Sequence, residues 1–185
     1  MTRLIVCDPI DASAVEAIRD LGIDVDVRDD ITLDALAEII SDYDAMIVRS
    51  RTKVREPLID KATNLKLIVR AGVGLDSINV DYADSKGITV ANTPAASTNA
   101  VAELTLGLML SLARHIPRAD ATMKAGEWAK KQLKGTEIQG KTLGVIGYGR
   151  IGQAVGEKAK ALGMTVVAHD PYVKHEDIVD FDELL

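Results

Sequence analysis

The chain has 185 residues, of which 47% are hydrophobic, and this is enough apolar material for one large domain or two small ones. Its formal net charge of −6 argues against binding to nucleic acid or to an anionic membrane, because both need a basic surface. The only cysteine is Cys7, so no internal disulfide can form, and the N-terminus does not resemble a secretory signal. We therefore expect a cytoplasmic protein.

The first half of the chain alternates short apolar runs, rich in β-branched residues, with helical patterns. This alternation is typical of a parallel sheet that carries helices on both faces. It predicts a doubly wound, flavodoxin-like domain over residues 1–95. The predicted strands are Leu4–Cys7, Val25–Val27, Ala45–Val48, Leu65–Val69 and Ile88–Ala91, and the predicted helices are Ala12–Leu21, Leu33–Ser41, Glu56–Ala62 and Val80–Lys86.

A long apolar stretch from Ala100 to Ile116 follows this domain. It contains Glu103 and Arg114, so it predicts a packed helix rather than a membrane span. Ser97 or Thr98 is expected to cap the helix. Because apolar residues cover nearly its whole circumference, we expect the helix to be buried between domains or between subunits.

A second, charged helix is predicted at Ala119–Lys131, and it contains the only tryptophan, Trp128. This tryptophan is interpreted either as a core residue or as an anchor in a dimer contact, because interfaces are enriched in tryptophan. An irregular link through Gly135 and Gly140 leads to the next strand. We expect the link to be an interface element.

Residues 141–171 read KTLGVIGYGRIGQAVGEKAKALGMTVVAHDP and predict a βαβ unit. A strand at Leu143–Ile146 is followed by a glycine turn of the pattern G-x-G-x-x-G and by an amphipathic helix. The second strand, Thr165–His169, leads directly to Asp170. This aspartate stands eighteen positions after the last glycine of the pattern, where a dinucleotide-binding unit needs a carboxylate.

Each residue of the pattern has a physical task in dinucleotide binding. Gly147 permits the tight turn, Gly149 lets the backbone approach a pyrophosphate, and Gly152 lets the helix pack close to the strand. The N–H groups at the helix N-terminus then favour the phosphates. Asp170 would accept hydrogen bonds from a ribose and repel a 2′-phosphate, so the predicted cofactor is NAD rather than NADP. The alternative is a structural turn in an unrelated α/β domain.

Several long motifs, in this order along the whole chain, resemble the D-isomer-specific 2-hydroxyacid dehydrogenases. They are AMIVRSRTKV, RAGVGLDSINVD, NTPAASTNAVAELTLGLMLSLAR and MKAGEWAKKQLKGTEIQGKTLGVIGYGRIG, the last continued by GMTVVAHDP. The resemblance implies that a flavodoxin-like domain binds a hydroxyacid and that a Rossmann domain over residues 96–185 binds NAD. It also implies that a cleft between the two closes for hydride transfer, and that the protein forms a homodimer or a larger homo-oligomer.

Arg49 and Arg51 match family positions that contact a substrate phosphate, which favours a phosphorylated hydroxyacid. The residues themselves are compatible with this role, because side chains two apart on an extended segment share a face. They also stand at the carboxyl end of a predicted parallel strand, where ligands gather in such folds. Lys53 is a weaker third member of the cluster. The alternative is an ordinary solvated strand end.

The segment after the fourth predicted strand matches a family loop whose backbone faces the substrate carboxylate and the nicotinamide. Glycine suits this position because it lets a main chain approach a ligand closely. A pair of residues inside the glycine pattern matches family positions that cover the pyrophosphate. The implied contacts are Arg70, Gly72 and Gly74 for the substrate, and Val73, Arg150 and Ile151 for the cofactor.

The family's catalytic arginine, its proton-transferring histidine and the carboxylate beside that histidine lie further along its chain than residue 185. The resemblance therefore implies no catalytic residue here, an incomplete cofactor domain and no turnover by this N-terminal portion alone. His115, His169 and His175 are expected to be structural or solvated, and no metal site is predicted.

Three alternatives stay open. The first is another member of the family, of the glyoxylate, lactate or formate type, which would use an unphosphorylated acid. The second is a non-catalytic NAD(H)-binding sensor that acts through another protein. The third is a structural dimerisation unit that uses Ala100–Gly140.

Overall fold

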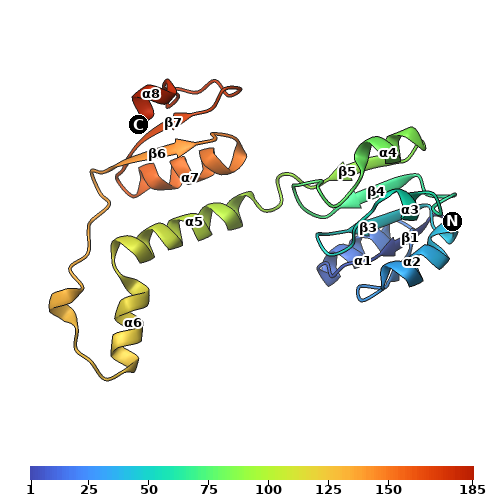
Figure 1. Ribbon diagram of the computed structural model, residues 1–185, viewed down its shortest axis with the longest axis horizontal. Coiled ribbons are helices and arrows are strands. Elements are labelled where there is room, and N and C mark those ends of the chain that lie inside the picture. The colour runs from blue at the N-terminus through green and yellow to red at the C-terminus, as the bar shows by residue number, and fades with distance from the viewer. The chain divides into compact units, whose positions relative to one another are not determined.

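The structure is a computed structural model that describes residues 1–185, and it divides into two units, Met1–Ala96 and Ser97–Leu185. Both units are built from parallel strands and helices, so the predicted α/β class is confirmed (Figure 1). None of the helices combines the length and the hydropathy that a membrane crossing would require.

The first unit is one parallel sheet with the strand order β2-β1-β3-β4-β5. This is the predicted flavodoxin-like order, in which the chain reverses direction across the sheet between β1 and β3. The strands are β1 Arg3–Val6, β2 Asp24–Val27, β3 Ala45–Val48, β4 Leu67–Arg70 and β5 Thr89–Asn92. The helices are α1 Ala12–Asp20, α2 Leu33–Ile39, α3 Glu56–Ile59 and α4 Val80–Ser85, with a 3₁₀ turn at Ile40–Asp42.

Alternate residues of the central strands serve two separate cores, as the two-residue period of a strand requires. Ile5 and Met46 point to the core under α2, α3 and α4, whereas Leu4 and Ile47 point to the core under α1. All four side chains are buried. Both faces of the sheet are therefore apolar, as expected for a doubly wound fold.

The element boundaries differ from the predicted ones where tight turns replace regular structure. Helix α3 ends at Ile59 instead of Ala62, because the N–H of Lys61 bonds to Leu58 and that of Ala62 bonds to Ile59, three residues back. Leu65 is buried, but it lies in a turn before β4 and not in the strand. The hydrophobic pattern correctly predicted that Ala62 and Leu65 are buried, but it did not predict their backbone conformation.

The second unit has two parallel strands, with Leu143 opposite Val166. Its core contains Leu106, Tyr148 and Ala168. The strands are β6 Thr142–Ile146 and β7 Thr165–His169. The helices are α5 Thr98–Ala113, α6 Ile116–Lys124, α7 Arg150–Ala161 and α8 Phe181–Leu184, with a 3₁₀ turn at Lys130–Gln132.

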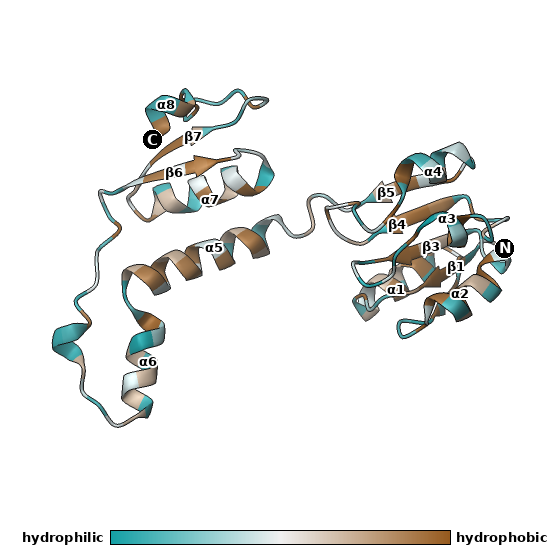
Figure 2. Cartoon of the chain, in the orientation of Figure 1, coloured by the Kyte–Doolittle hydropathy of each residue, from teal (hydrophilic) through white to brown (hydrophobic).

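Helix α5 lacks the predicted cap, and it is only partly buried within one chain. Ser97 occupies the N-cap position of α5, but it has helical φ and ψ, and its side chain makes no capping hydrogen bond. The hydroxyl of Thr98 has no partner either. Helix α5 is hydrophobic along most of its length (Figure 2), and α7 packs against it. Leu104 and Leu112 are nevertheless 63% and 80% exposed. Within this chain the helix is therefore not buried all round.

The predicted charged helix is shorter than expected and begins earlier. His115 has a left-handed φ of 54° and joins α5 to α6, which ends at Lys124. Trp128 then lies in irregular chain and is 78% exposed. The interpretation of this tryptophan as a core residue is wrong.

The turn between β6 and α7 is packed so closely that side chains are excluded from it. A Cβ on Gly152 would overlap the carbonyl oxygen of Gly147, whose φ is 89°. One helical turn further on, a Cβ on Gly156 would overlap the hydroxyl of Tyr148. Tyr148 is 2% exposed and fills the space that both glycines leave. Because Gly152 and Gly156 carry no side chains, α7 can pack directly against the turn and Tyr148.

This packing predicts opposite effects for the same substitution at two helical glycines. Gly152→Ala should lower the free energy of unfolding of the second unit by about 1–3 kcal/mol, the usual cost of overpacking. Gly107→Ala should raise it by up to about 1 kcal/mol, because a Cβ on this α5 residue would meet nothing within 4 Å. Urea unfolding followed by circular dichroism measures both. Equal changes in the two variants would contradict the packing argument.

Candidate functional site

The first candidate site lies at the carboxyl edge of the first sheet, where ligands bind in folds of this topology. The loops after β1, β3 and β4 meet there because these strands are adjacent and parallel. Arg49 and Arg51 follow β3 directly, and Arg70 is the last residue of β4. The sheet therefore brings three predicted arginines to one edge.

Asp8, just after β1, is a residue that the sequence reasoning missed. It is 1% exposed, and its carboxylate accepts hydrogen bonds from the N–H groups of Arg49 and Thr52, from the hydroxyl of Thr52 (2.9 Å) and from Nε of Arg51 (2.9 Å). Burial alone would raise its pKa, but these hydrogen bonds hold the pKa below its ordinary value. A usable signal was present, since an acid follows an apolar strand at the edge that carries the arginines.

The two arginines of the β3 loop bond back to the β1 loop. Arg51 donates from Nε to Asp8 and from Nη2 to the carbonyl oxygen of Cys7. Arg49 donates from Nη1 to the carbonyl oxygen of Pro9 (3.1 Å). Arg51 is not an ordinary solvated residue at a strand end, because its guanidinium group forms an ion pair with the buried Asp8. Its side chain remains 50% exposed, so donors stay available to a ligand.

Lys53 lies apart from this arrangement. Its ammonium group donates to the carbonyl oxygen of Ser50 (2.9 Å). The residue lines a separate pocket of about 280 Å³ between α2 and α3, together with Leu33, Arg55 and Lys61. Lys53 shares no hydrogen-bond acceptor with Arg49 or Arg51.

The loop after β4 is shaped by its own arginine. Gly72 has a φ of 150°, and a Cβ there would overlap Nη1 of Arg70, so this glycine makes room for the guanidinium group. Nε of Arg70 is buried and has no acceptor. Asn92 donates to the carbonyl oxygen of Val73 (2.7 Å), and Thr93 N–H donates to that of Gly72 (3.0 Å). The last residue of β5 and the residue after it are thereby hydrogen-bonded to the loop.

The remaining part of this loop is tied to the β3 loop. The hydroxyl of Ser77 donates to the carbonyl oxygen of Arg49 (3.2 Å), and Arg55 donates to that of Asp76 (2.7 Å). A Cβ on Gly74 would stand 3.2 Å from a carboxylate oxygen of Asp76. The three loops therefore form one hydrogen-bonded assembly.

The second candidate site is the N-terminus of α7. Its first helical hydrogen bond runs from Gln153 N–H to the carbonyl oxygen of Gly149 (2.9 Å), so the N–H groups of Arg150, Ile151 and Gly152 are not used within the helix. A Cβ on Gly149 would meet nothing within 4 Å. The space in front of these donors is open, which suits an anion.

Asp170 has a structural task besides the predicted one. One carboxylate oxygen accepts the N–H of Tyr148 (2.8 Å), and the other accepts the N–H groups of Tyr172 (2.9 Å) and Val173 (3.1 Å). The bonds from Tyr172 and Tyr148 are the main causes that lower its pKa. A carboxylate has about four acceptor positions, so capacity for a ribose hydroxyl remains. Asp170 joins the end of β7 to the glycine turn.

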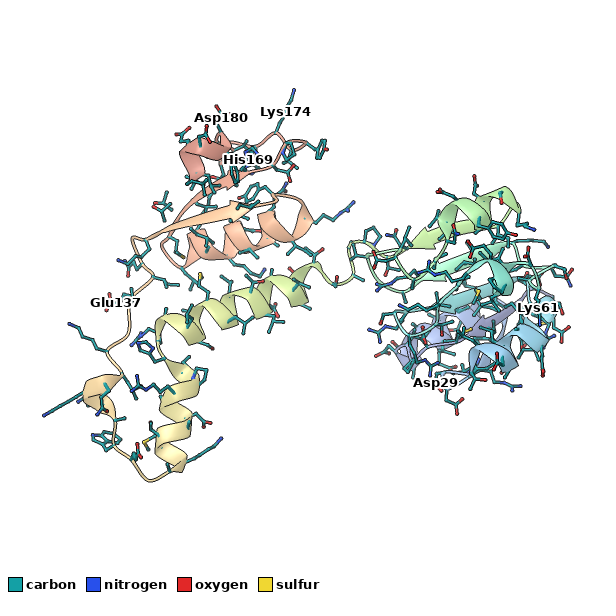
Figure 3. All side chains as sticks on the ribbon, in the orientation of Figure 1. Asp29, Lys61, Glu137, His169, Lys174 and Asp180 are labelled. Atoms are coloured by element: carbon teal, nitrogen blue, oxygen red, sulfur yellow. The ribbon has the colours of Figure 1, made fainter.

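The three histidines have local partners. His169 is the last residue of β7 (Figure 3), and its ring packs edge to face against Phe181 of α8. Its Nδ1 lies 3.2 Å from the carbonyl oxygen of Val179. His175 accepts the N–H of Asp177 at Nδ1 (3.2 Å), and His115 forms the left-handed link. No three histidine, cysteine or acidic side chains come together as a metal-binding group.

Comparison with known proteins covers nearly the whole chain. The sequence model of the family described as D-isomer specific 2-hydroxyacid dehydrogenase, catalytic domain, matches residues 4–180. D-3-phosphoglycerate dehydrogenase of Methanocaldococcus jannaschii is 51% identical over 176 residues, which are 95% of this chain and 33% of that protein. Hydroxypyruvate reductase of Thermotoga maritima is 47% identical over 186 residues, which are 98% of this chain and 61% of that protein.

A solved structure agrees in fold. The crystal structure of NAD⁺-bound 3-phosphoglycerate dehydrogenase of Entamoeba histolytica has a TM-score of 0.79 and 33% identity. The match covers 99% of this chain and 59% of that one. The chain thus spans between about a third and three fifths of the length of these relatives.

Proposed function

Because the chain belongs to the D-isomer specific 2-hydroxyacid dehydrogenase family, we propose that the protein oxidises D-3-phosphoglycerate to 3-phosphohydroxypyruvate with NAD, as a step of serine biosynthesis. The reaction breaks the C2–H bond of the hydroxyacid and releases the proton of its hydroxyl group. NAD, when bound, accepts the hydride. The residues named below bind and orient the reactants, and none of them is assigned the proton transfer.

The observation that carries the substrate assignment is the set of guanidinium groups at the edge of the first sheet. Arg49, Arg51 and Arg70 bring planar donors that suit a phosphate and a carboxylate. The guanidinium group of Arg70 makes no hydrogen bond or ion pair within the chain, and its Nε has no acceptor, so its donors are not committed to the protein. Gly72 and Gly74 keep the neighbouring backbone free of side chains. A phosphorylated hydroxyacid supplies both anionic groups.

The second unit supports a dinucleotide. The open space at Gly149 and the free N–H groups of α7 fit a pyrophosphate, so the residues present suit the cofactor. The lowered pKa of Asp170 keeps its carboxylate charged, which favours a ribose hydroxyl and opposes a 2′-phosphate. The proposed cofactor contacts are Val73, Gly147, Gly149, Arg150, Ile151, Gly152 and Asp170.

A second candidate is an unphosphorylated substrate, which the similarity to a hydroxypyruvate reductase favours. Glyoxylate-, lactate- and formate-type enzymes belong to the same alternative. A non-catalytic NAD(H) sensor is the third possibility, and it would bind the cofactor without turnover. The three arginines at one edge favour the phosphorylated acid.

We also propose that the protein forms a homodimer through α5. Leu104, Leu108 and Leu112 follow one another at intervals of four residues, and they are 63%, 62% and 80% exposed. Such a stripe on one helical face marks an interaction surface. The exposed Trp128 lines a neighbouring hollow of about 500 Å³, which suits an aromatic interface anchor. A cytoplasmic location is proposed as well, because the only cysteine, Cys7, is a free thiol.

The dinucleotide proposal predicts loss of binding without loss of fold. Gly149→Ala should weaken NADH binding by at least about tenfold, because its methyl group would occupy the place of the pyrophosphate. The free energy of unfolding should fall by no more than about 1 kcal/mol, since the site is open and only the helix cap changes. Calorimetric titration with NADH and NADPH provides the test. A variant that binds NADH like the parent would refute the site, and a parent that prefers NADPH would refute the role of Asp170.

The substrate proposal predicts a preference that depends on Arg49. The chain should bind D-3-phosphoglycerate more tightly than D-glycerate, and Arg49→Ala should raise the Kd for the phosphorylated acid by about tenfold, as loss of a charge-assisted hydrogen bond would. Calorimetric titration is the readout, because turnover is not expected from these residues alone. Arg28→Ala, which removes another exposed arginine of the same unit, is the control and should leave both Kd values unchanged. Equal Kd values for the two acids would favour the unphosphorylated alternative.

The dimer proposal predicts that charge on α5 separates the subunits. Leu104→Glu with Leu108→Glu should shift the chain from dimer to monomer in sedimentation velocity, because carboxylates would be buried in the contact. Leu21→Glu is the matched control, since Leu21 is also exposed (77%) but lies at the end of α1. A parent chain that is monomeric at high concentration would disprove the contact.

A further inference from the structure

Asp8 stands at the ligand edge of the first sheet and yet cannot touch a ligand. It is 1% exposed, and every partner of its carboxylate belongs to the segment Arg49–Thr52. Charged side chains are rarely buried to this degree unless their partners are complete. Here four donors share two oxygens, so the carboxylate is fully used inside the chain.

The hydrogen bonds between the β1 and β3 loops run from donors on the β3 loop to acceptors on the β1 loop. The β1 loop supplies acceptors through the carboxylate of Asp8 and the carbonyl oxygens of Cys7 and Pro9. The β3 loop supplies donors through its backbone and through the guanidinium groups of Arg49 and Arg51. Nε and Nη2, which lie on one edge of the Arg51 guanidinium group, both donate to the β1 loop. The orientation of the group is therefore fixed before a ligand binds. A free arginine would have to lose this rotamer freedom on binding.

From this geometry we propose that Asp8 is a positioning residue for the anion site: it orients the Arg51 guanidinium group and the backbone of residues 49–52 toward the phosphorylated hydroxyacid. The inference rests on the proposed function, because it assigns a role within that site. Asp8 acts through Arg51 and Thr52 and makes no contact with the ligand itself.

Charge and positioning predict opposite signs for the removal of this carboxylate. Asp8 is an anion next to an arginine that binds an anion, so by Coulomb's law alone its neutralisation should tighten ligand binding. If Asp8 orients the arginine, its neutralisation should weaken binding. Asp8→Asn keeps the size of the side chain, but it places an amide NH₂ against partners that are all donors, so at least one of these bonds must break.

The test compares Asp8→Asn with the parent 185-residue chain in titrations with D-3-phosphoglycerate and with inorganic phosphate. NMR spectroscopy of the Arg51 Nε–H group reports its order directly. We expect a rigid Nε–H group in the parent, a mobile one in the variant, and an affinity for D-3-phosphoglycerate that falls by about tenfold, the order expected when one flexible side chain must be fixed on binding.

Three further variants separate positioning from general effects. Asp26→Asn removes a carboxylate of the same unit that bonds to Tyr43 (2.6 Å) and pairs with Arg28 instead of Arg49 or Arg51, and it should leave the affinity unchanged. Thr52→Val deletes one donor to Asp8 and should weaken binding by a smaller factor, whereas Thr52→Ser keeps the hydroxyl and should restore it. These two variants keep the test open if Asp8→Asn does not fold.

The outcomes distinguish this inference from the proposed function. If the parent binds D-3-phosphoglycerate and Asp8→Asn binds it equally or more tightly, positioning is refuted and the substrate site stands. An Arg51 Nε–H group that is mobile in the parent, or equally rigid in both chains, also refutes positioning. If the parent binds no phosphorylated acid, the proposed substrate is wrong, and the role of Asp8 in binding falls with it.

Discussion

The parallel pairing of β1 with β3 is the constraint on which the first site depends. It sends both strand ends to the same edge of the sheet, so that an acid after one strand lies beside two arginines after the other. Residues 41 and 43 positions apart in sequence thereby become hydrogen-bond partners. The buried carboxylate of Asp8 is tolerable only because this pairing supplies four donors. The two loops are therefore joined by backbone and side-chain hydrogen bonds.

At the carboxyl edge of the second sheet, an acidic residue again joins the ends of two neighbouring parallel strands. Asp170 follows β7 and accepts the N–H of Tyr148 in the glycine turn after β6. In both units an acid after one strand organises the loop after its parallel neighbour. The acids differ in exposure, since Asp8 is buried and Asp170 lies nearer the surface. Burial limits Asp8 to a role inside the protein, whereas Asp170 can also face a ligand.

Glycines in the two sites answer to different constraints, although they look alike in the sequence. Gly152 is excluded from carrying a side chain by the backbone of its own turn, whereas at Gly72 the constraint is a φ of 150°, and its neighbour is the flexible side chain of Arg70. Gly149 faces open space, so the protein itself places no steric demand on it. Open space alone does not indicate a ligand, since Gly107 has it as well, and it is the position of Gly149 in front of the unused N–H groups of α7 that supports an anion site. This distinction exists only in three dimensions.

The sequence by itself determined the α/β class, the strand positions to within about two residues and the glycine turn, because hydrophobic period and glycine spacing are local signals. It also indicated Arg49, Arg51, Arg70 and Asp170 as residues at strand ends. Only the tertiary structure revealed Asp8 as the partner of Arg51, and only it showed that α5 keeps an exposed face. Burial and hydrogen-bond partners depend on which strands and helices become neighbours, and sequence separation carries no information about that choice.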